Sequence, residues 1–354
     1  MITNVVIDGS KLLYIGHSFN DKGGISTLER NYKKIIFPYN HIAIFDSGPF
    51  IKKIRILCYG TFSMIKWLCT KRQIKIVHIH VSSGIDFYRN CIPIIVARLF
   101  SKKIVLHIHG GFFVEFCKKN IYINSFFINM ADMILVVSDY LKRQLDELNF
   151  SPPIHRLYNI LNSTKIHIKK TKMNDHKIII GFLGSINENK HFLDVVKLFQ
   201  IHKDLQDYFT LKIAGVGETE KLLGMINKYN LHCIEYLGWI DGTQKDVFFN
   251  EIDLLVQPSD FESFGLSILE AMSYGIPSIA TKVGGIPELI DEGENGFLIN
   301  RNDWEGLYKR LILIHKDISV IFAMRNACFN RVKFFYPNTI CAQLEKYYSC
   351  LLND

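Results

Sequence analysis

Short runs of β-branched residues alternate with longer amphipathic stretches along this whole chain of 354 residues. Such alternation is typical of repeated strand–helix units, whose strands lie parallel in covered sheets. The sequence therefore predicts an α/β protein. The predicted strands of the first half are Leu12–Gly16, His41–Phe45, Ile74–Ile79, Ile104–His109, Met133–Val137 and His155–Tyr158, with Ile2–Ile7 as a possible further strand. Those of the second half are Ile178–Leu183, Leu211–Ala214, Ile234–Leu237, Leu254–Gln257, Ser278–Thr281 and Phe297–Ile299.

A polar, lysine-rich stretch at residues 162–177 separates the two halves and shows no core-forming period. We interpret it as a linker, because the chain length fits two domains of about 150 residues each. The expected result is two Rossmann-like lobes, the first over residues 1–161 and the second over residues 178–336. In such sheets ligands bind at the carboxyl ends of the strands, so the cleft between the lobes is the expected site.

Basic residues are concentrated in the first half, whereas the second half is acidic on balance, and the net charge is +8. A basic half indicates nucleic acid, an anionic membrane or a phosphorylated substrate as partner, unless the charge serves solubility alone. The chain has no nucleic-acid-binding module of aromatic and basic residues and no motif of a DNA-recognition helix, so we expect no nucleic-acid partner.

The eight cysteines show no C-x2-C spacing, which argues against a zinc ribbon. The amino terminus lacks a basic segment followed by a long apolar run, and no apolar stretch reaches about 18 residues. We therefore expect no secretory signal, no spanning helix, and a cytoplasmic protein with reduced thiols.

Several catalytic motifs are absent from the sequence. It has no D-x-D motif, no G-x4-G-K-[ST] phosphate loop, no H-E-x-x-H and no G-x-S-x-G. Gly215 and Gly217 follow a predicted strand as in a dinucleotide fingerprint, but Glu220 stands where the third glycine belongs. A plain tight turn is therefore the preferred interpretation.

Histidines lie two residues apart at His78 and His80, and again at His107 and His109. Side chains repeat every two residues along a strand, so each pair shares one face of its predicted strand. If the strands are neighbours, the four imidazoles could form a metal site. No acidic or cysteine ligand keeps a fixed spacing with them, so we favour the alternative that some line a cleft and others pack in the core.

Residues 256–288 carry the densest chemical signal in the chain. A strand ends near Gln257, a polar loop follows, and Gly265 opens a helix that runs to about Tyr274. A glycine at a helix start leaves backbone N–H groups accessible, which suits a phosphate or a diphosphate.

Glu262 lies in the loop, and Glu270 lies in the helix after an interval of seven residues. Such carboxylates can hold sugar or ribose hydroxyls, although two glutamates alone are more often solvated charges. The whole segment, with Gly284-Gly285 after the next strand, resembles the signature of the family 4 retaining glycosyltransferases (glycosyl transferases group 1). The two glutamates match that family's paired-glutamate motif.

The resemblance extends over nearly the whole chain, in the family's order. The other matching segments are Gly23-Gly24 after the first strand, His109-Gly110, residues 131–138, residues 180–184 and residues 211–217. The resemblance implies the GT-B fold, in which two Rossmann-like lobes with parallel sheets face a central cleft. It also implies a carboxy-terminal helix over residues 337–354 that returns to the amino-terminal lobe.

The implied activity is the transfer of a sugar, with retention, from a UDP- or GDP-sugar to a glycan or lipid-linked acceptor. Bacterial surface polysaccharide synthesis (O-antigen, capsule or exopolysaccharide) is the implied setting. The family pattern assigns catalytic roles to three residues. Lys190 would stabilise the departing diphosphate, Glu262 would hold hydroxyls of the transferred sugar, and His109 would reach that sugar from the other lobe. No protein nucleophile, metal or other cofactor is expected.

A second set of residues is expected to bind the donor. Glu270 would accept hydrogen bonds from the ribose, and the glycines would let the backbone approach the diphosphate closely. The donor-binding residues implied by the resemblance are Gly23, Gly24, Gly184, Ser185, Phe264, Gly265, Leu266 and Glu270.

The chain departs from the family pattern at three positions. Ser185 replaces an arginine that grips the diphosphate, His191 replaces the glycine after Lys190, and Asn159 is followed by isoleucine instead of glycine. One side-chain cation is therefore missing at the leaving group. This loss keeps open the alternative of a catalytically weak partner subunit that only binds the nucleotide sugar. A nucleotide-sugar 2-epimerase of the same fold is disfavoured by the glutamate pair.

Residues 51–75 form a basic segment without acids, interleaved with apolar residues. Such a segment can lie on an anionic membrane surface, which would suit a lipid-linked acceptor and a peripheral location on the inner face of the plasma membrane. Two ordinary surface helices with lysines on the wet side are the alternative. The residues of this candidate membrane and acceptor patch are Lys52, Lys53, Arg55, Lys66, Lys71 and Arg72, with Lys75 beside them.

Overall fold

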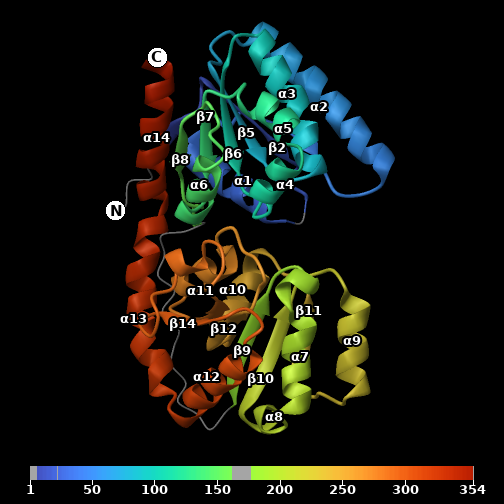
Figure 1. Ribbon diagram of the computed structural model, residues 1–354, viewed down its shortest axis with the longest axis vertical. Helices are drawn as coiled ribbons and strands as arrows, with labels where there is room; N and C mark the ends of the chain where they lie inside the picture. The colour runs from blue at the N-terminus through green and yellow to red at the C-terminus, as the bar shows by residue number, and fades with distance from the viewer. Residues whose placement is uncertain (1–5, 22, 162–176, 354) are drawn as a thin grey trace. The chain divides into compact units, whose positions relative to one another are not determined.

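The structure is a computed structural model that describes residues 6–21, 23–161 and 177–353, and the chain divides into two compact units (Figure 1). The first unit comprises Met1–Thr164 and Phe335–Asp354, and the second comprises Lys165–Phe334. The predicted linker, apart from Lys177, lies outside the described residues, as does most of the possible strand Ile2–Ile7. Each unit contains a six-stranded parallel sheet, which confirms the predicted α/β class with two Rossmann-like lobes.

The sheet of the first unit has the order β4-β2-β5-β6-β7-β8, and all its strands are parallel. Its strands are β2 (Leu12–His17), β4 (His41–Phe45), β5 (Ile76–Val81), β6 (Lys103–Ile108), β7 (Met133–Val136) and β8 (Ile154–Arg156). Strands β5 and β7 are buried over their whole length. Near-continuous apolar runs of this kind are typical of parallel sheets that are covered on both faces. The predicted strands lie within a few residues of these bounds.

A short parallel pair, β1 (Ile7–Asp8) and β3 (Ile36–Phe37), stands beside this sheet. Strand β1 begins at the last residue of the possible strand Ile2–Ile7, and β3 was not predicted. The helices of the first unit are α1 (Gly24–Ile35), α2 (Phe50–Thr70), α3 (Ile85–Leu99), α4 (Phe113–Lys119), α5 (Ile121–Ile128), α6 (Asp139–Asp146) and α14 (Pro337–Asn353). Helix α14, the last of the chain, contributes Ile340, Leu344 and Leu351 to one buried cluster with Leu12 and Tyr14 of β2. The carboxy-terminal helix is thus part of the core of the first unit.

The second unit has the strand order β11-β10-β9-β12-β13-β14, again all parallel. Its strands are β9 (Ile178–Leu183), β10 (Phe209–Ala214), β11 (Ile234–Gly238), β12 (Leu254–Gln257), β13 (Ser278–Thr281) and β14 (Gly296–Ile299). Its helices are η1 (Glu188–Lys190), α7 (Phe192–Ile201), α8 (Asp204–Tyr208), α9 (Thr219–Lys228), α10 (Gly242–Glu251), α11 (Leu266–Ser273), η2 (Ile286–Glu288), α12 (Trp304–Lys316) and α13 (Ser319–Val332). The short helix η3 (Lys333–Phe335) crosses the boundary between the units.

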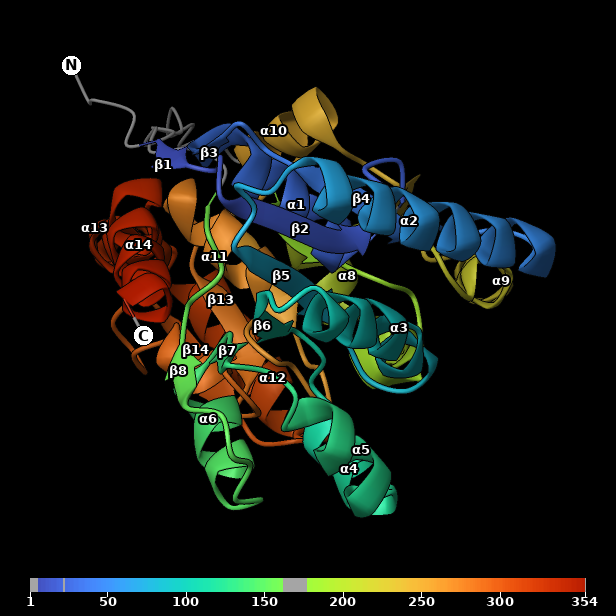
Figure 2. The same ribbon diagram turned by 90° about the horizontal axis from the view of Figure 1, so that it is seen from above.

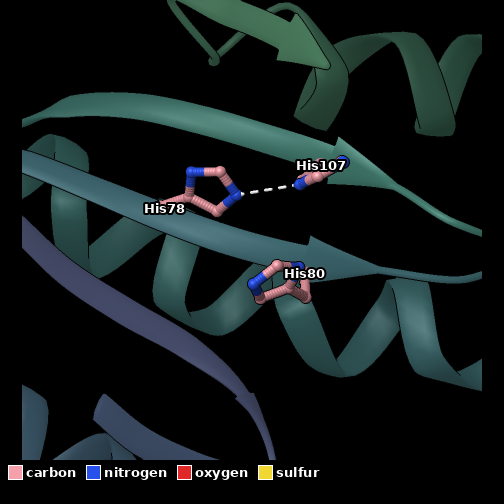
Figure 3. A group of neighbouring side chains, drawn as sticks. All are labelled: His78, His80 and His107. Carbon is pink, nitrogen blue, oxygen red and sulfur yellow. Dashed lines mark hydrogen bonds between the residues drawn. The ribbon is translucent and has the colours of Figure 1, made fainter. Parts of the chain in front are cut away.

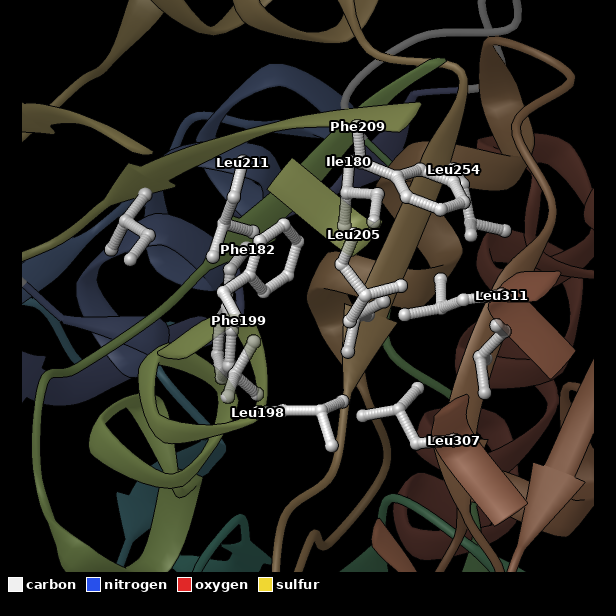
Figure 4. Close-up of a cluster of buried hydrophobic side chains, with 14 of the residues drawn as sticks. Ile180, Phe182, Leu198, Phe199, Leu205, Phe209, Leu211, Leu254, Leu307 and Leu311 are labelled. Carbon is white, nitrogen blue, oxygen red and sulfur yellow. The ribbon is translucent and has the colours of Figure 1, made fainter. Parts of the chain in front are cut away.

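The core of the second unit is built where α7, α8 and α12 pack on the sheet (Figure 4). Phe182 of β9, Phe199 of α7 and Leu311 of α12 are among its buried side chains. Strand order reverses between β9 and β12, because the chain adds strands first on one side of β9 and then on the other. In open parallel sheets, the loops that follow the two strands at such a switch point lead in opposite directions. They leave room for a ligand at the carboxyl ends of these strands. The loops after β9 and β12 are therefore where a site is expected.

Candidate functional site

The loop after β12 is held in place by buried side chains of its own segment. Gln257 Nε2 donates to Ser259 Oγ at 2.7 Å, and Ser267 Oγ donates to Gln257 Oε1 at 3.1 Å. Gln257 and Ser259 are completely buried, so water does not compete for these bonds. The end of β12 and the first turn of α11 are thereby fixed relative to each other.

Gly265 sets the direction in which α11 leaves this loop. Its φ of +100° lies in a region that residues with a side chain rarely adopt, and an added Cβ would approach Ile268 and Leu289 to 3.2 and 3.3 Å. The helix begins at Leu266, directly after buried Phe264 and Gly265, as predicted. A helix N-terminus preceded by glycine presents backbone N–H groups without a side chain in front of them.

Lys190 and Glu262, which the sequence analysis assigned to one site, form an ion pair. Both side chains are mostly buried, at 17% exposure each. Two hydrogen bonds join the loops that carry the pair. Asn189 Nδ2 donates to the carbonyl of Phe261 at 3.1 Å, and the N–H of Asp260 donates to the carbonyl of Asn189 at 2.9 Å. The loops after β9 and β12 are thus joined at the switch point of the sheet.

Gly284 allows the Glu262 loop to lie directly on the segment after β13. Its φ is +53°, and an added Cβ would stand 1.8 Å from the carbonyl oxygen of Glu262. The N–H of Gly285 donates to the same oxygen at 3.1 Å. The glycine pair that follows β13 therefore positions the backbone of Glu262.

Gly184 and Ser185 follow β9 and face the same loops. The Cβ position of Gly184 lies 3.9 Å from Lys190 Cε, and Ser185 is exposed. Gly215, after β10, has a φ of +151° and would set a Cβ 1.7 Å from the carbonyl oxygen of Gly184. Gly215 and Gly217 thus serve close contact between two turns, in agreement with the tight-turn interpretation.

Glu270 is held by a residue that the sequence analysis did not identify. Lys245 Nζ, from α10, donates to both carboxylate oxygens of Glu270 at 2.7 and 2.6 Å. Both side chains are largely buried. Nothing in the local pattern around Lys245 signals this contact, because β12 separates α10 from α11 in the sequence. Each glutamate of the motif therefore has a lysine partner.

His191, where the family has glycine, adopts a left-handed conformation with a φ of +57°. Its imidazole makes contacts of 2.8 Å with Asp194 and 3.0 Å with Asp260. Burial lowers the pKa of His191, but the bonds to the two carboxylates outweigh it, so the net shift is upward. The ion pairs offset the backbone strain of a non-glycine residue at this position.

In the first unit, Gly23 and Gly24 stand at the start of α1 in open space. An added Cβ at Gly24 would meet nothing within 4 Å, and one at Gly23 would meet only Ser26 Oγ at 3.9 Å. Gly23 has an extended backbone that any residue adopts. The packing of the described residues therefore does not require glycine at either position.

Three buried histidines, His78, His80 and His107, lie on the neighbouring strands β5 and β6, where His80 pairs in register with His107 (Figure 3). A fourth, His109, follows directly after β6 and is also buried. His78 Nε2 and His107 Nδ1 share a hydrogen bond of 3.1 Å, and His80 Nδ1 and His109 Nε2 share one of 2.8 Å. The hydroxyl of Tyr348, from α14, lies 2.8 Å from His78 Nδ1. Burial lowers the pKa of His109 to about 3, so its imidazole is neutral at ordinary pH.

His78, His80 and His107 have one ligand nitrogen each within 4.8 Å of one another and could hold a metal ion. Two of these imidazoles already hydrogen-bond each other, and the group includes no carboxylate or thiolate to offset a buried cation. The interpretation favoured from the sequence therefore fits better. His78, His80 and His107 are completely buried, and His109 lies at the end of the row with 9% exposure.

A second polar group of the first unit was missed by the sequence analysis. His17, at the end of β2, lies 3.1 Å from Asp21 and 3.3 Å from Asp86. Asp86 also bonds Arg89 at 2.6 Å and the N–H of Ser82 at 2.7 Å. Burial opposes a charge on His17, yet its bonds to the two aspartates raise its pKa above the ordinary value. These residues are far apart in sequence, so no local motif announces them.

The predicted basic patch falls on one long helix and the turn after it. Lys52, Lys53, Arg55 and Lys66 lie in α2, and Lys71 and Arg72 follow it. Lys71 stacks on the ring of Trp67 at 3.6 Å, and Lys52 pairs with Asp46 at 3.1 Å. The segment is thus a single helix and not two.

Comparison with known proteins agrees with this architecture. Residues 163–329 match the family described as Glycosyl transferases group 1. This match covers most of the second half of the chain and supports the resemblance to the glycosyl transferases group 1 family, also called family 4. The two parallel six-stranded sheets are those of the GT-B fold. Within the described residues, no helix is both long and apolar enough to cross a membrane.

Two relatives illustrate the similarity in sequence. The chain is 28% identical over 290 residues to an uncharacterized glycosyltransferase, MJ1178, of Methanocaldococcus jannaschii, with 80% of this chain and 76% of that protein covered. It is 29% identical over 273 residues to an uncharacterized 41.2 kDa protein in the cps region of Klebsiella pneumoniae, with 73% and 70% covered.

Two solved structures share the fold at low sequence identity. A sucrose-phosphate synthase from Thermosynechococcus elongatus superposes with a TM-score of 0.81 at 16% identity, covering 97% of this chain and 99% of that one. Anabaena Alr3699/HepE in complex with UDP-glucose superposes with a TM-score of 0.75 at 17% identity, covering 96% and 99%.

Proposed function

We propose that this chain transfers a sugar from a UDP-sugar, with retention, to a glycan or lipid-linked acceptor. The observation that carries the proposal is the pairing of both motif glutamates with lysines beside the N-terminus of α11. Two cations and a row of backbone N–H groups around one helix start suit a diphosphate. The complex of Anabaena HepE with UDP-glucose supports a uridine nucleotide over GDP, and we carry it to this chain as part of the proposal.

The donor would exchange partners with the ion pair at the switch point. When a diphosphate enters, Lys190 turns from Glu262 to the phosphate oxygens, because these carry more charge. Glu262 is then free to accept hydrogen bonds from hydroxyls of the sugar. Lys190 and the N–H groups of Phe264, Gly265 and Leu266 stabilise the charge that develops on the departing diphosphate.

The remaining assigned residues orient the donor. Glu270 accepts from the ribose hydroxyls, with Lys245 fixing its carboxylate. His109 is proposed to contact the transferred sugar, with its ring oriented by His80. Gly23 and Gly24 allow the backbone before α1 to approach the diphosphate.

The reaction itself needs no protein nucleophile in this proposal. The acceptor hydroxyl attacks the anomeric carbon from the side that the diphosphate leaves. The bond from that carbon to the phosphate oxygen breaks as the bond to the acceptor oxygen forms, and the departing phosphate takes the acceptor's proton. Retention of configuration follows from this geometry.

Assembly of a bacterial surface polysaccharide is the proposed setting. The relative from the Klebsiella cps region supports it, although that protein is itself uncharacterized. The sugar and the acceptor depend on the shape of the pocket and are left open in the proposal.

A donor-binding partner subunit with weak activity is the second candidate. Ser185 is exposed beside Lys190 where the family has arginine, so one side-chain cation is missing at the leaving group. Lys190 and the backbone N–H groups at the start of α11 remain at this position, which favours the active enzyme.

Release of UDP from a panel of UDP-sugars, with and without glycan acceptors, tests the proposal. Substitution Lys190→Ala removes one stabilising cation and should lower turnover by about 10²-fold. The control is Lys197→Ala, which removes an exposed lysine of α7 that pairs with Asp194 and should leave turnover unchanged. Donor binding without turnover of any sugar would favour the partner subunit. Equal losses in both variants would contradict the role given to Lys190.

A further inference from the structure

The outward side of α3 is entirely apolar. Its exposed residues are Ile85, Tyr88, Ile92, Ile95 and Leu99, and no polar residue of the helix is exposed. They follow one another at intervals of three and four residues, so they form one stripe along the helix. Ile85 and Leu99, at its two ends, are 78% and 77% exposed. A surface helix of a folded protein normally shows charged or polar residues on this side.

A second stripe of this kind runs along the neighbouring helix α2. Its exposed members, also at intervals of three and four residues, are Ile51, Ile54, Cys58, Phe62, Ile65 and Cys69. The only fully buried residues of α2 are Gly60, Met64 and Leu68, so its first turns contain no fully buried side chain. Free apolar side chains on a protruding helix are costly in water unless another surface covers them.

Helix α5 extends the apolar surface on the other side of α3. Its exposed residues are Tyr122, Ile123 and Phe126. Asn120, at the start of α5, donates to the hydroxyl of Tyr88 at 3.4 Å, which links α5 to α3. Figures 1 and 2 show α2, α3 and the α4–α5 pair in succession on one side of the first unit. We call the exposed apolar residues of α2, α3 and α5 the apolar face.

The charges around the apolar face are positive. Lys52, Lys53, Arg55 and Lys66 lie in α2, which contains no acidic residue, and Lys118 and Lys119 end α4. The acids of α2, α3, α4 and α5 are Asp86, which is held by His17 and Arg89, and exposed Glu115. Lysine and arginine can lay their stems along apolar surface while their charges reach outward.

We propose that the apolar face docks the first unit on an anionic lipid membrane, with α3 at its centre and the cations of α2 and α4 at its rim. Apolar side chains would enter the headgroup and acyl boundary, and the rim cations would pair with lipid phosphates. A second copy of the chain is the competing occupant. A two-fold contact through this face would set the cations of α2 against each other, so the charge favours the lipid. The proposal rests on the surface alone and does not depend on the proposed glycosyl transfer.

Vesicle flotation with the full chain tests the proposal. The chain should float with phosphatidylcholine vesicles that contain phosphatidylglycerol and not with phosphatidylcholine alone, and added salt should weaken binding. The double substitution Ile85→Ser and Leu99→Ser should abolish flotation. The matched control is Ile201→Ser, an isoleucine of α7 in the second unit that is 69% exposed.

Substitutions that remove single positive charges test the contribution of the rim cations separately from that of the apolar residues. Arg55→Gln and Lys66→Gln should each lower affinity for the anionic vesicles by about fivefold. Lys316→Gln, an exposed lysine of α12, should not. Circular dichroism and the melting midpoint of each variant show whether it is folded.

Three results would overturn the proposal. The first is equal binding to neutral and anionic vesicles, or to neither. The second is an equal loss in Ile201→Ser. The third is a dimer in solution that Ile85→Ser and Leu99→Ser convert to a monomer, which would assign the face to a second copy.

Discussion

At the residue scale, the two glutamates of the motif are positioned by residues that lie outside the motif. Glu262 lies on Gly284 and Gly285, and Glu270 lies against Lys245. The motif could be recognised from the sequence because its spacing is local. Lys245 could not, because the contact brings together two helices that are separated by a strand.

Gly284→Ala should displace the Glu262 loop. The added Cβ would stand 1.8 Å from a backbone oxygen, and the positive φ adds strain of about 1 kcal/mol. Gly293→Ala is the control, because its φ is +78° and nothing lies within 4 Å of the added Cβ. Urea unfolding should show a larger loss of stability for Gly284→Ala, and only this variant should lose binding of UDP. If the two variants lose the same stability and bind UDP equally well, Gly284 does not position the Glu262 loop.

His191 stands where the family has glycine, and its contribution to stability depends on pH. The folded-state pKa of His191 is raised above the unfolded value of about 6.5, so its contribution to stability is present below that pH and is lost as pH rises through the folded value. Asp194, Asp260, Lys197 and Arg301 complete the charged neighbourhood.

His191→Gly should therefore be less stable than the native chain near about pH 6, and as stable or more stable near about pH 8. Glycine relieves the left-handed strain but lacks the ion pairs. Melting midpoints of both proteins across this range measure the difference. A difference that does not change with pH would show that the two aspartates do not stabilise a protonated His191.

At the element scale, the strands were the most predictable part of the fold. Strands β5, β7, β12 and β13 are short buried segments rich in apolar residues, and this pattern can be recognised from the sequence. Strand β3 was missed because a strand of two residues shows no periodic pattern. The apolar face was seen only in part, since the stripe on α3 has the spacing of an ordinary core-facing helix.

Helix α14 should behave as a core element of the first unit. Leu344 is completely buried, so Leu344→Ala should cost about 2–5 kcal/mol of stability. Leu352→Ala is the control on the same helix, because Leu352 is 40% exposed and should cost about 0.5 kcal/mol or less. Chemical denaturation of both variants compares them. Similar costs would mean that α14 is not needed by the core.

At the scale of the whole molecule, the candidate site residues fall on two units of one architecture. The second unit carries the paired glutamates at its switch point, and the first carries the histidine row, the glycines before α1 and the apolar face. The family and the fold could be predicted because the signature is dense and ordered. The identity of sugar and acceptor could not, because these depend on how side chains shape a pocket.

Binding of nucleotides without added metal tests the central claim most directly. Thermal shift is measured with UDP, GDP and ADP on the native chain, on Glu270→Ala, and on Glu251→Ala, which removes a surface partner of Lys212. UDP at about 100 times its dissociation constant should add roughly 2.7 kcal/mol of stability to the native chain and to Glu251→Ala, but not to Glu270→Ala. If no nucleotide stabilises the folded native chain, or if Glu270→Ala responds like the native chain, the donor site is not where we place it.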